Sequence, residues 1–458
     1  MNQAIDATAT GKPHELSRSL LPRHITMITI GGVIGAGLFV GSSAAIAAAG
    51  PAALVSYLLA GAMVFIVMRM LAEMALTHPH VRSFSEFSRE GLGHAGGFIA
   101  GWLYWYFWIV VVPIEAIAGA QILQLWFDLP VWQIGLGLMA GMTAVNLLSA
   151  RSYGEFEFWF SSIKVAAIVA FILVTAAYAF GLTAPDGATW SNLAGHGGFA
   201  PNGWVPVLAT VTTVFFSLVG AEITTVAAVE SQDPEQAVVR MATSITWRIL
   251  LFYVLSLFLI VCVVAWPAIT PGESPFTLAL SAMGFEWGSA AMSFIILTAV
   301  LSCLNSAVYV CSRVLHVLAD RGDAPRWLVE VNVRRVPARS ILLGSIAGVI
   351  GVLLAIISPQ GVFAYLVSSS GTVILFVYLM TAVAHIRLRH RHPETETKTV
   401  RVWWFPWLSY ATIAAMVAVL IAMGLTPALS SQLYFSLLAL IVVSSAYYLF
   451  RRPRGRAG

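Results

Sequence analysis

The chain has 458 residues, of which 59% are hydrophobic and 10% are charged. Soluble domains carry roughly 25% charged residues, so this composition excludes a soluble globular fold and indicates a protein embedded in lipid. The net charge of +4 does not indicate a nucleic-acid partner, because its distribution follows a membrane pattern. The three cysteines all lie in apolar stretches and imply no disulfide framework.

Twelve stretches are apolar enough to be membrane helices, which need about 20 residues each. They are residues 25–49, 52–76, 97–126, 130–149, 157–180, 205–229, 246–266, 287–312, 340–357, 362–386, 403–425 and 431–450. The first stretch is longer than the roughly 7–15 apolar residues of a signal peptide. We therefore predict an all-α membrane protein with a polar segment 1–24, one transmembrane domain 25–450 and a basic tail 451–458.

Basic residues are confined to one side of the predicted topology. With the N-terminus inside, every lysine and arginine except Lys164 falls in or near a cytoplasmic connection or end. The predicted external connections, among them 181–204 and 267–286, contain none. This positive-inside asymmetry supports an even number of helices with both termini in the cytoplasm.

The first predicted helix contains four glycines within residues 31–37. Each glycine weakens a helix by about 1 kcal/mol relative to alanine. One interpretation is close helix packing through small residues. The other is an unwound segment whose backbone N–H groups hold a substrate carboxylate. We favour the second, with a predicted binding segment of Gly32, Val33, Ile34, Gly35, Ala36 and Gly37.

The sixth predicted helix also carries a glycine near its middle. If residues 25–180 and 205–386 form two inverted five-helix repeats, the first and sixth helices occupy matching positions. Interrupted helices at matching positions mark the binding sites of transporters. The predicted binding residues in the sixth helix are Phe216, Ser217, Gly220 and Glu222.

Four ionisable residues lie inside apolar spans: Glu73, Glu115, Lys164 and Glu222. A charge at mid-membrane costs roughly 2.5–3.5 kcal/mol, so such residues face the bundle interior and act in a pathway or a pair. Lys164 is either a proton carrier, half of a structural ion pair with a glutamate, or a side chain that reaches the inner surface. Glu222 binds a substrate ammonium, carries a proton, or accepts backbone N–H groups at the break.

Other charged and aromatic residues have simpler expected roles. Arg69 and Glu73 are spaced to pair with each other on one helix. Glu155 and Glu157 are expected to open the fifth helix, because acidic residues stabilise a first turn. The aromatic run 102–108 either lines a substrate path or packs at the membrane interface.

The sequence lacks the motifs that are typical of several other functional classes. No phosphate-binding loop of the Gly-x-x-x-x-Gly-Lys-Ser/Thr type occurs, so ATP is not the expected energy source. No set of metal ligands is complete, and no cofactor is expected.

Longer motifs resemble a known family. They are Arg23–Ile28, Gly31–Phe39, Gly154–Phe160 followed by Lys164, and Arg321–Pro325. On these residues the chain resembles the amino acid–polyamine–organocation transporters, in their bacterial amino-acid permease branch. Further segments are most similar to the 4-aminobutyrate (GABA) permeases of that branch. These segments are Ala36, Arg69–Met74, Val112–Ala116, Val219–Glu222 and Ser302–Ser306.

The resemblance implies a five-plus-five inverted-repeat core of the LeuT type, with residues 403–450 as two added helices. It implies proton-coupled import of a small amino acid across the bacterial cytoplasmic membrane, with Lys164 as a coupling residue. We predict the buried Glu115 as a second coupling residue. By resemblance, Lys164 stands where sodium-coupled relatives hold sodium.

Three alternatives to a GABA permease stay open. Gly32 and Gly37 follow the broader branch rather than the GABA permeases, which leaves proline or another α-amino acid as substrate. A non-transporting amino-acid sensor would need a soluble output domain. A membrane enzyme would need a catalytic constellation near a membrane face. The sequence sets no oligomeric state.

Overall fold

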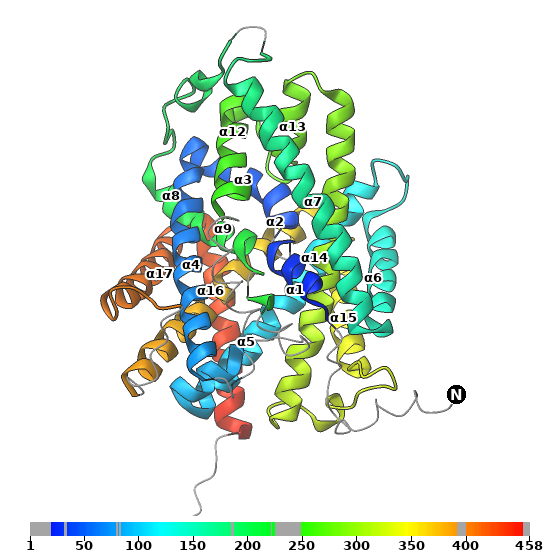
Figure 1. Ribbon diagram of the computed structural model, residues 1–458, viewed down its shortest axis with the longest axis vertical. Helices are drawn as coiled ribbons and strands as arrows, with labels where there is room; N and C mark the ends of the chain where they lie inside the picture. The colour runs from blue at the N-terminus through cyan, green and yellow to red at the C-terminus, as the bar shows by residue number, and fades with distance from the viewer. Residues whose placement is uncertain are drawn as a thin grey trace, which may run out of the picture.

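The computed structural model describes residues 20–31, 34–78, 81, 84–184, 187–220, 222–224, 249–391 and 400–451. Within these ranges the regular secondary structure is helical (Figure 1). The α-helices are α1 (Pro22–Gly31), α2 (Ala36–Phe39), α3 (Gly41–Ala49), α4 (Ala53–Thr77), α5 (Phe84–Leu123), α6 (Val131–Leu148), α7 (Ala150–Ala179), α8 (Trp204–Ala209), α9 (Val211–Leu218), α12 (Ser256–Val263), α13 (Pro275–Ala282), α14 (Glu286–Asp320), α15 (Ala338–Leu354), α16 (Pro359–Arg391), α17 (Trp407–Leu425) and α18 (Pro427–Ala446). Two π-helical segments, η4 (Ile249–Leu255) and η8 (Tyr447–Arg451), precede α12 and follow α18. Short 3-10 turns are η1 (Gly50–Ala52), η2 (Trp190–Leu193), η5 (Trp266–Ala268) and η6 (Arg326–Leu328).

The helices account for the apolar stretches of the sequence. In the described part of the chain, eight helices are long and apolar enough to cross a membrane. One of these runs from Ala36 to Thr77 through the turn at Gly50 (φ 62°), and so joins two predicted spans. Three further apolar helices, 204–218, 249–263 and 338–354, are shorter. The all-helical class is confirmed, and the count of twelve spans stays a prediction.

Several helix ends lie outside the predicted spans. α5 begins at Phe84 rather than at 97, and α14 continues to Asp320 rather than 312. Hydropathy detects only the part of a helix that must avoid water, whereas a helix can continue beyond the lipid. α7 begins at Ala150, because the Ser149 hydroxyl caps it by accepting the Ser152 N–H at 3.0 Å.

The start of α7 corrects the prediction for Glu155 and Glu157. Neither residue opens the helix, since both lie beyond its first turn. Glu155 is half-buried and pairs with Arg23, whereas Glu157 is fully buried. Glu157 therefore belongs to the interior of the bundle.

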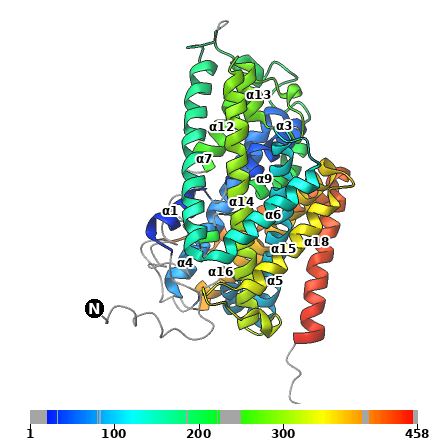
Figure 2. The same cartoon turned by 90° about the vertical axis from the view of Figure 1, so that its right-hand side faces the viewer.

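The core is built by long helices around a broken one. Figure 2 shows α14 running the length of the molecule, with α18 at one edge. Most of the apolar window of α14 is buried, whereas almost none of the window of α18 is. In Figure 1 the segments α1, α2 and α3 follow one another up the centre of the view. Exposed leucines and isoleucines on α17 and α18 suit contact with lipid, so these two helices lie outside the core.

The predicted pair of Arg69 and Glu73 is wrong. The Glu73 carboxylate contacts the Arg389 guanidinium at 3.0 Å and accepts the Val402 N–H at 2.7 Å. Arg69 instead donates to the Arg401 carbonyl at 2.6 Å. A buried carboxylate takes the partners that tertiary packing brings to it, and these tie the ends of α4 and α16 to residues 400–402.

Candidate functional site

The first helix is interrupted at its glycine cluster. α1 ends at Gly31 and α2 begins at Ala36. Ile34 and Gly35 between them are not helical, and Gly35 is extended (φ −147°, ψ −153°). Gly32 and Val33 lie outside the described residues. The interruption releases the Ile34 carbonyl and the Ala36 N–H from helical hydrogen bonding, as the glycine pattern predicted.

The sixth predicted helix is interrupted as well. α9 ends at Leu218, Val219 is extended (φ −69°, ψ 150°), and Gly220 has φ 118°. That φ is rare for residues with a side chain, so glycine is needed at the break. The Tyr253 hydroxyl donates to the Ser217 carbonyl at 2.7 Å and satisfies an acceptor at the end of α9.

The two interruptions lie directly against each other. The Ser217 hydroxyl donates to the Gly37 carbonyl at 2.8 Å. A Cβ on Gly37 would lie 2.7 Å from the Ser217 Cα, so only glycine permits this approach. Close packing through a small residue is therefore observed at Gly37, and the helix is unwound at Ile34 and Gly35, whereas binding of a substrate carboxylate there stays a prediction.

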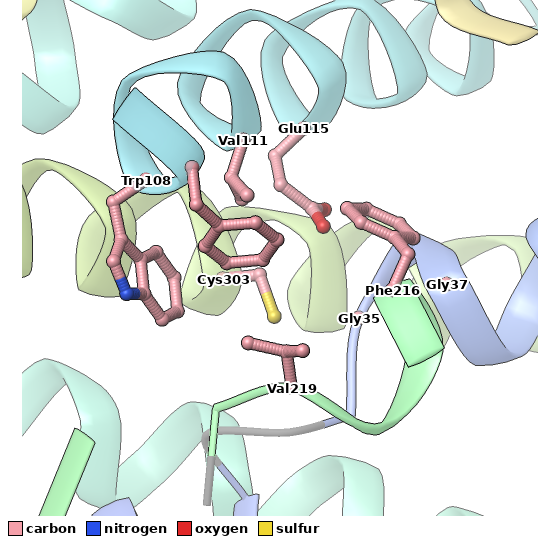
Figure 3. Close-up of a pocket in the computed structure, with 9 residues that line it drawn as sticks. Gly35, Gly37, Trp108, Val111, Glu115, Phe216, Val219 and Cys303 are labelled. Atoms are coloured by element: carbon pink, nitrogen blue, oxygen red, sulfur yellow. The ribbon is translucent and has the colours of Figure 1, made fainter. Parts of the chain in front are cut away.

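A small cavity of about 20 Å³ lies where the two breaks meet α5 and α14 (Figure 3). It is lined by Gly35, Gly37, Phe107, Trp108, Val111, Glu115, Phe216, Val219 and Cys303. A cavity of this size holds about one water molecule. The side chains of Trp108, Val111 and Glu115 come from one face of α5 (Figure 3), because they follow one another at helical spacing.

The sequence predicted part of this lining. Gly35, Gly37 and Phe216 were predicted as binding residues and Glu115 as a coupling residue, and the cavity brings these four together. The aromatic run contributes its last two residues, Phe107 and Trp108, which favours the substrate-path interpretation for them. Val111, Val219 and Cys303 were missed. Helical spacing from Glu115 could have found Val111, whereas nothing in the sequence links Cys303 to the first helix.

Glu115 occupies part of the predicted carboxylate site. Its Oε2 accepts the Ala36 N–H at 3.3 Å, and its side chain is buried. The freed amide of the first break thus already holds a carboxylate, supplied by the protein itself. A substrate carboxylate would meet Glu115 at this amide.

Lys164 contacts the same break through the Ile34 carbonyl. Its ammonium donates to the Ile34 carbonyl at 3.0 Å and to the Ser302 hydroxyl at 2.8 Å. Glu157 Oε1 lies 3.7 Å from Lys164 Nζ, and both side chains are fully buried. Full burial excludes a side chain that reaches the inner surface. Glu157 precedes Lys164 by about two turns on the same face of α7, and this spacing could have indicated it as the partner of Lys164.

Glu222 braces the second break. Its Oε2 accepts the Gly220 N–H at 3.1 Å and the Tyr378 hydroxyl at 3.1 Å. Tyr104 donates to Oε1 at 3.4 Å. Of the three interpretations given by the sequence, these contacts match the acceptance of backbone N–H groups, and a substrate role for Glu222 stays a prediction.

The bracing contacts give a testable expectation for Glu222→Gln. Glutamine replaces one acceptor oxygen by a donor NH₂, so part of the set of donors around Glu222 loses its partner. Hydrogen bonds to a charged group are worth about 1.5–3 kcal/mol, and a loss of stability of this order is expected. Thermal unfolding of purified protein would detect it, with the exposed Glu273→Gln as control. Equal unfolding temperatures for the two variants would contradict the bracing role.

The bundle and its cavity define a multi-pass membrane protein built around two interrupted helices. The chain belongs to the amino acid permease family, because the family model matches residues 24–454.

Relatives that align with nearly the whole chain support its membership of this family. The gamma-aminobutyric acid permease of Bacillus subtilis (strain 168) is 43% identical, over 96% of this chain and 94% of the relative. The probable GABA permease of Pseudomonas aeruginosa is 42% identical, over 98% of this chain and 97% of the relative. An aromatic amino acid transport protein of Corynebacterium glutamicum is 38% identical, over 92% of each chain.

A solved transporter shares the fold. The crystal structure of the Eremococcus coleocola manganese transporter, with a bis-isothiourea compound, matches 93% of this chain and 92% of its own. The TM-score is 0.58 at 13% sequence identity. At this identity the similarity concerns the fold alone.

Proposed function

We propose that the protein imports GABA across the bacterial cytoplasmic membrane, coupled to protons, by alternating access. The observation that carries the proposal is the meeting of two interrupted helices at a cavity, with a carboxylate and an ammonium on the first break. Relatives named GABA permeases at 42–43% identity support the choice of substrate. Twelve membrane helices, ten of them in two inverted five-helix repeats and two added after them, with both termini cytoplasmic, complete the proposed architecture.

The substrate carboxylate binds the segment Gly32–Gly37, which contains the non-helical Ile34 and Gly35, through backbone N–H groups. Its methylene chain lies along the apolar wall of Trp108, Val111 and Val219. Its ammonium is held at the second break, by carbonyls near Ser217 and Gly220 or by Glu222. The cavity of about 20 Å³ is too small for an amino acid, so the two halves must separate before substrate enters.

Proton coupling follows from the crowding of charge at the first break. Two carboxylates at the Ala36 N–H repel each other, and a proton on Glu115 removes that repulsion. Lys164 donates to the Ile34 carbonyl at the first break, and loss of its positive charge would weaken this hydrogen bond and the attraction to Glu157. A change of charge at Glu115 or Lys164 therefore alters the geometry of the break, around which the two halves of the protein rock between inward and outward states.

Competition with unlabelled amino acids tests the substrate. Purified protein in liposomes should accumulate labelled GABA from an acidic outside medium. Unlabelled GABA should block uptake, whereas proline, alanine and phenylalanine should not. Uptake of labelled proline or an aromatic amino acid, without uptake of GABA, would keep the mechanism and replace the substrate.

Gly35→Leu is expected to fill the cavity. A Cβ at this position would already lie 2.3 Å from Cys303 Sγ and 3.1 Å from Glu115 Oε1. We expect affinity for GABA to fall by at least about tenfold, which corresponds to about 1.4 kcal/mol of binding free energy. The affinity is measured by equilibrium binding of labelled GABA. The control is Gly137→Leu, since a Cβ there meets nothing within 4 Å. Unchanged affinity in a well-inserted Gly35→Leu variant would refute the site.

A further inference from the structure

A second buried carboxylate lies beside Lys164 but outside the cavity. Glu157 Oε1 accepts the Ser161 hydroxyl at 2.9 Å and the Ser302 hydroxyl at 2.7 Å. Its Oε2 accepts the Ser306 hydroxyl at 3.2 Å. All these side chains are at most 1% exposed. The Glu157 carboxylate thus bridges α7 and α14 in a site closed to solvent.

The directions of these hydrogen bonds define the charge of Glu157. An ammonium can only donate, so Ser302 accepts from Lys164 and its own hydrogen points at Glu157. Ser306 donates to Glu157, so it accepts from the Tyr153 hydroxyl at 3.1 Å. Each hydroxyl that contacts Glu157 therefore presents a hydrogen to it. An ionised carboxylate only accepts, and this arrangement suits an anion.

A proton on Glu157 would disturb this arrangement. A protonated carboxyl needs an acceptor, and one of the three serine hydroxyls would have to turn its hydrogen away. A Ser302 hydroxyl turned away would no longer link the Lys164 ammonium to Glu157, and a Ser306 hydroxyl turned away would no longer donate to the carboxylate. The ionised carboxylate is the state in which all three serine hydroxyls donate to Glu157.

We infer that Glu157 is a positioning residue for proton coupling: a buried carboxylate that holds the Lys164 ammonium on the Ile34 carbonyl of the first break. The inference rests on the proposed function, because it assigns Glu157 a part in the coupling role of Lys164. Glu157 acts through Lys164 and the Ser302 hydroxyl, and it does not line the cavity.

Other charged and titratable groups face the pair from the neighbouring helices. Glu115 on α5 and Cys303 on α14 interact electrostatically with Lys164. Tyr153 on α7 interacts with Glu157 and with Arg313 on α14. Glu115 is a second carboxyl group near the Lys164 ammonium, and among the carboxyl groups in the described part of the chain only Glu157 is connected to that ammonium through a shared hydroxyl. Glu157 is therefore the anion that orients Lys164.

Three variants in liposomes test the inference: Glu157→Gln, Lys164→Met and the double variant. The readout is the ratio of pH-gradient-driven GABA accumulation to GABA counterflow at equal pH, per amount of folded protein. Both single variants should lower the ratio by about tenfold or more, and the double variant should lower it no further, because coupled residues act as one unit. Glu155→Gln on the same helix is the matched control and should keep the wild-type ratio. A wild-type ratio in Glu157→Gln, or a further loss in the double variant, would overturn the inference.

Thermal stability provides a second test that needs no substrate. Removing one partner of a buried ion pair leaves an uncompensated charge, whereas removing both leaves a neutral site. Each single variant should therefore unfold at a lower temperature than the double variant. A double variant less stable than both single variants would show that Glu157 and Lys164 are not partners. If the wild type transports no GABA, the proposed function fails, and the stability comparison still decides whether Glu157 holds Lys164.

Discussion

Gly37→Ala is expected to lower transport strongly while leaving the protein in the membrane. The added Cβ would lie 2.7 Å from the Ser217 Cα, which is backbone and cannot turn aside. The two interrupted helices would then separate, and the hydrogen bond from Ser217 to the Gly37 carbonyl would be lost. We expect initial uptake of labelled GABA in liposomes to fall by about tenfold or more, since misplacement of a site by about 1 Å can cost that much or more.

The matched control for Gly37→Ala is Gly41→Ala, close by on α3. A Cβ at Gly41 would meet no atom closer than the Ala36 carbonyl oxygen at 3.7 Å, which is an ordinary contact. Gly41→Ala should therefore transport at a rate close to the wild type. Equal rates for the two variants would show that the close approach of the breaks is not required.

Lys164→Met is expected to remove proton-driven accumulation. Methionine keeps the length of the side chain but cannot donate to the Ile34 carbonyl or to Ser302. It also leaves Glu157 buried without its counter-charge, and breaking such a pair costs about 3–5 kcal/mol of stability. The measurement is the steady-state gradient of labelled GABA across liposomes with an acidic outside, corrected for the amount of folded protein.

The control for this variant is Arg339→Met, which removes a cation from a half-exposed pair with Glu330. Exposed pairs are worth at most about 1 kcal/mol, so this variant should accumulate GABA normally. Full accumulation by Lys164→Met would exclude Lys164 from coupling.

The sequence predicted the features that lipid and helix physics enforce locally. Glycines in the middle of apolar spans marked both breaks, because a helix tolerates such clusters only where protein or water surrounds them. Glu115, Lys164 and Glu222 were predicted to face the interior, and all three are buried. These expectations follow from the sequence of one helix in a membrane and do not require knowing which helices pack beside it.

Features that depend on packing between helices were missed. Cys303 and Val219 reach the cavity only because α14 and the second break meet the first. Glu157 was placed at a helix start because its span was judged by hydropathy, and its partners Ser302 and Ser306 come from a helix far along the chain. Arg69 and Glu73 had a permissible local spacing, but tertiary contacts gave each of them other partners.

The most direct test of the account is whether a pH gradient alone drives GABA into liposomes that contain only the purified wild-type protein. The account predicts accumulation above the outside concentration when the outside is acidic, none at equal pH, and collapse on addition of a protonophore. Uptake that ignores the pH gradient, or no uptake of GABA at all, would contradict it.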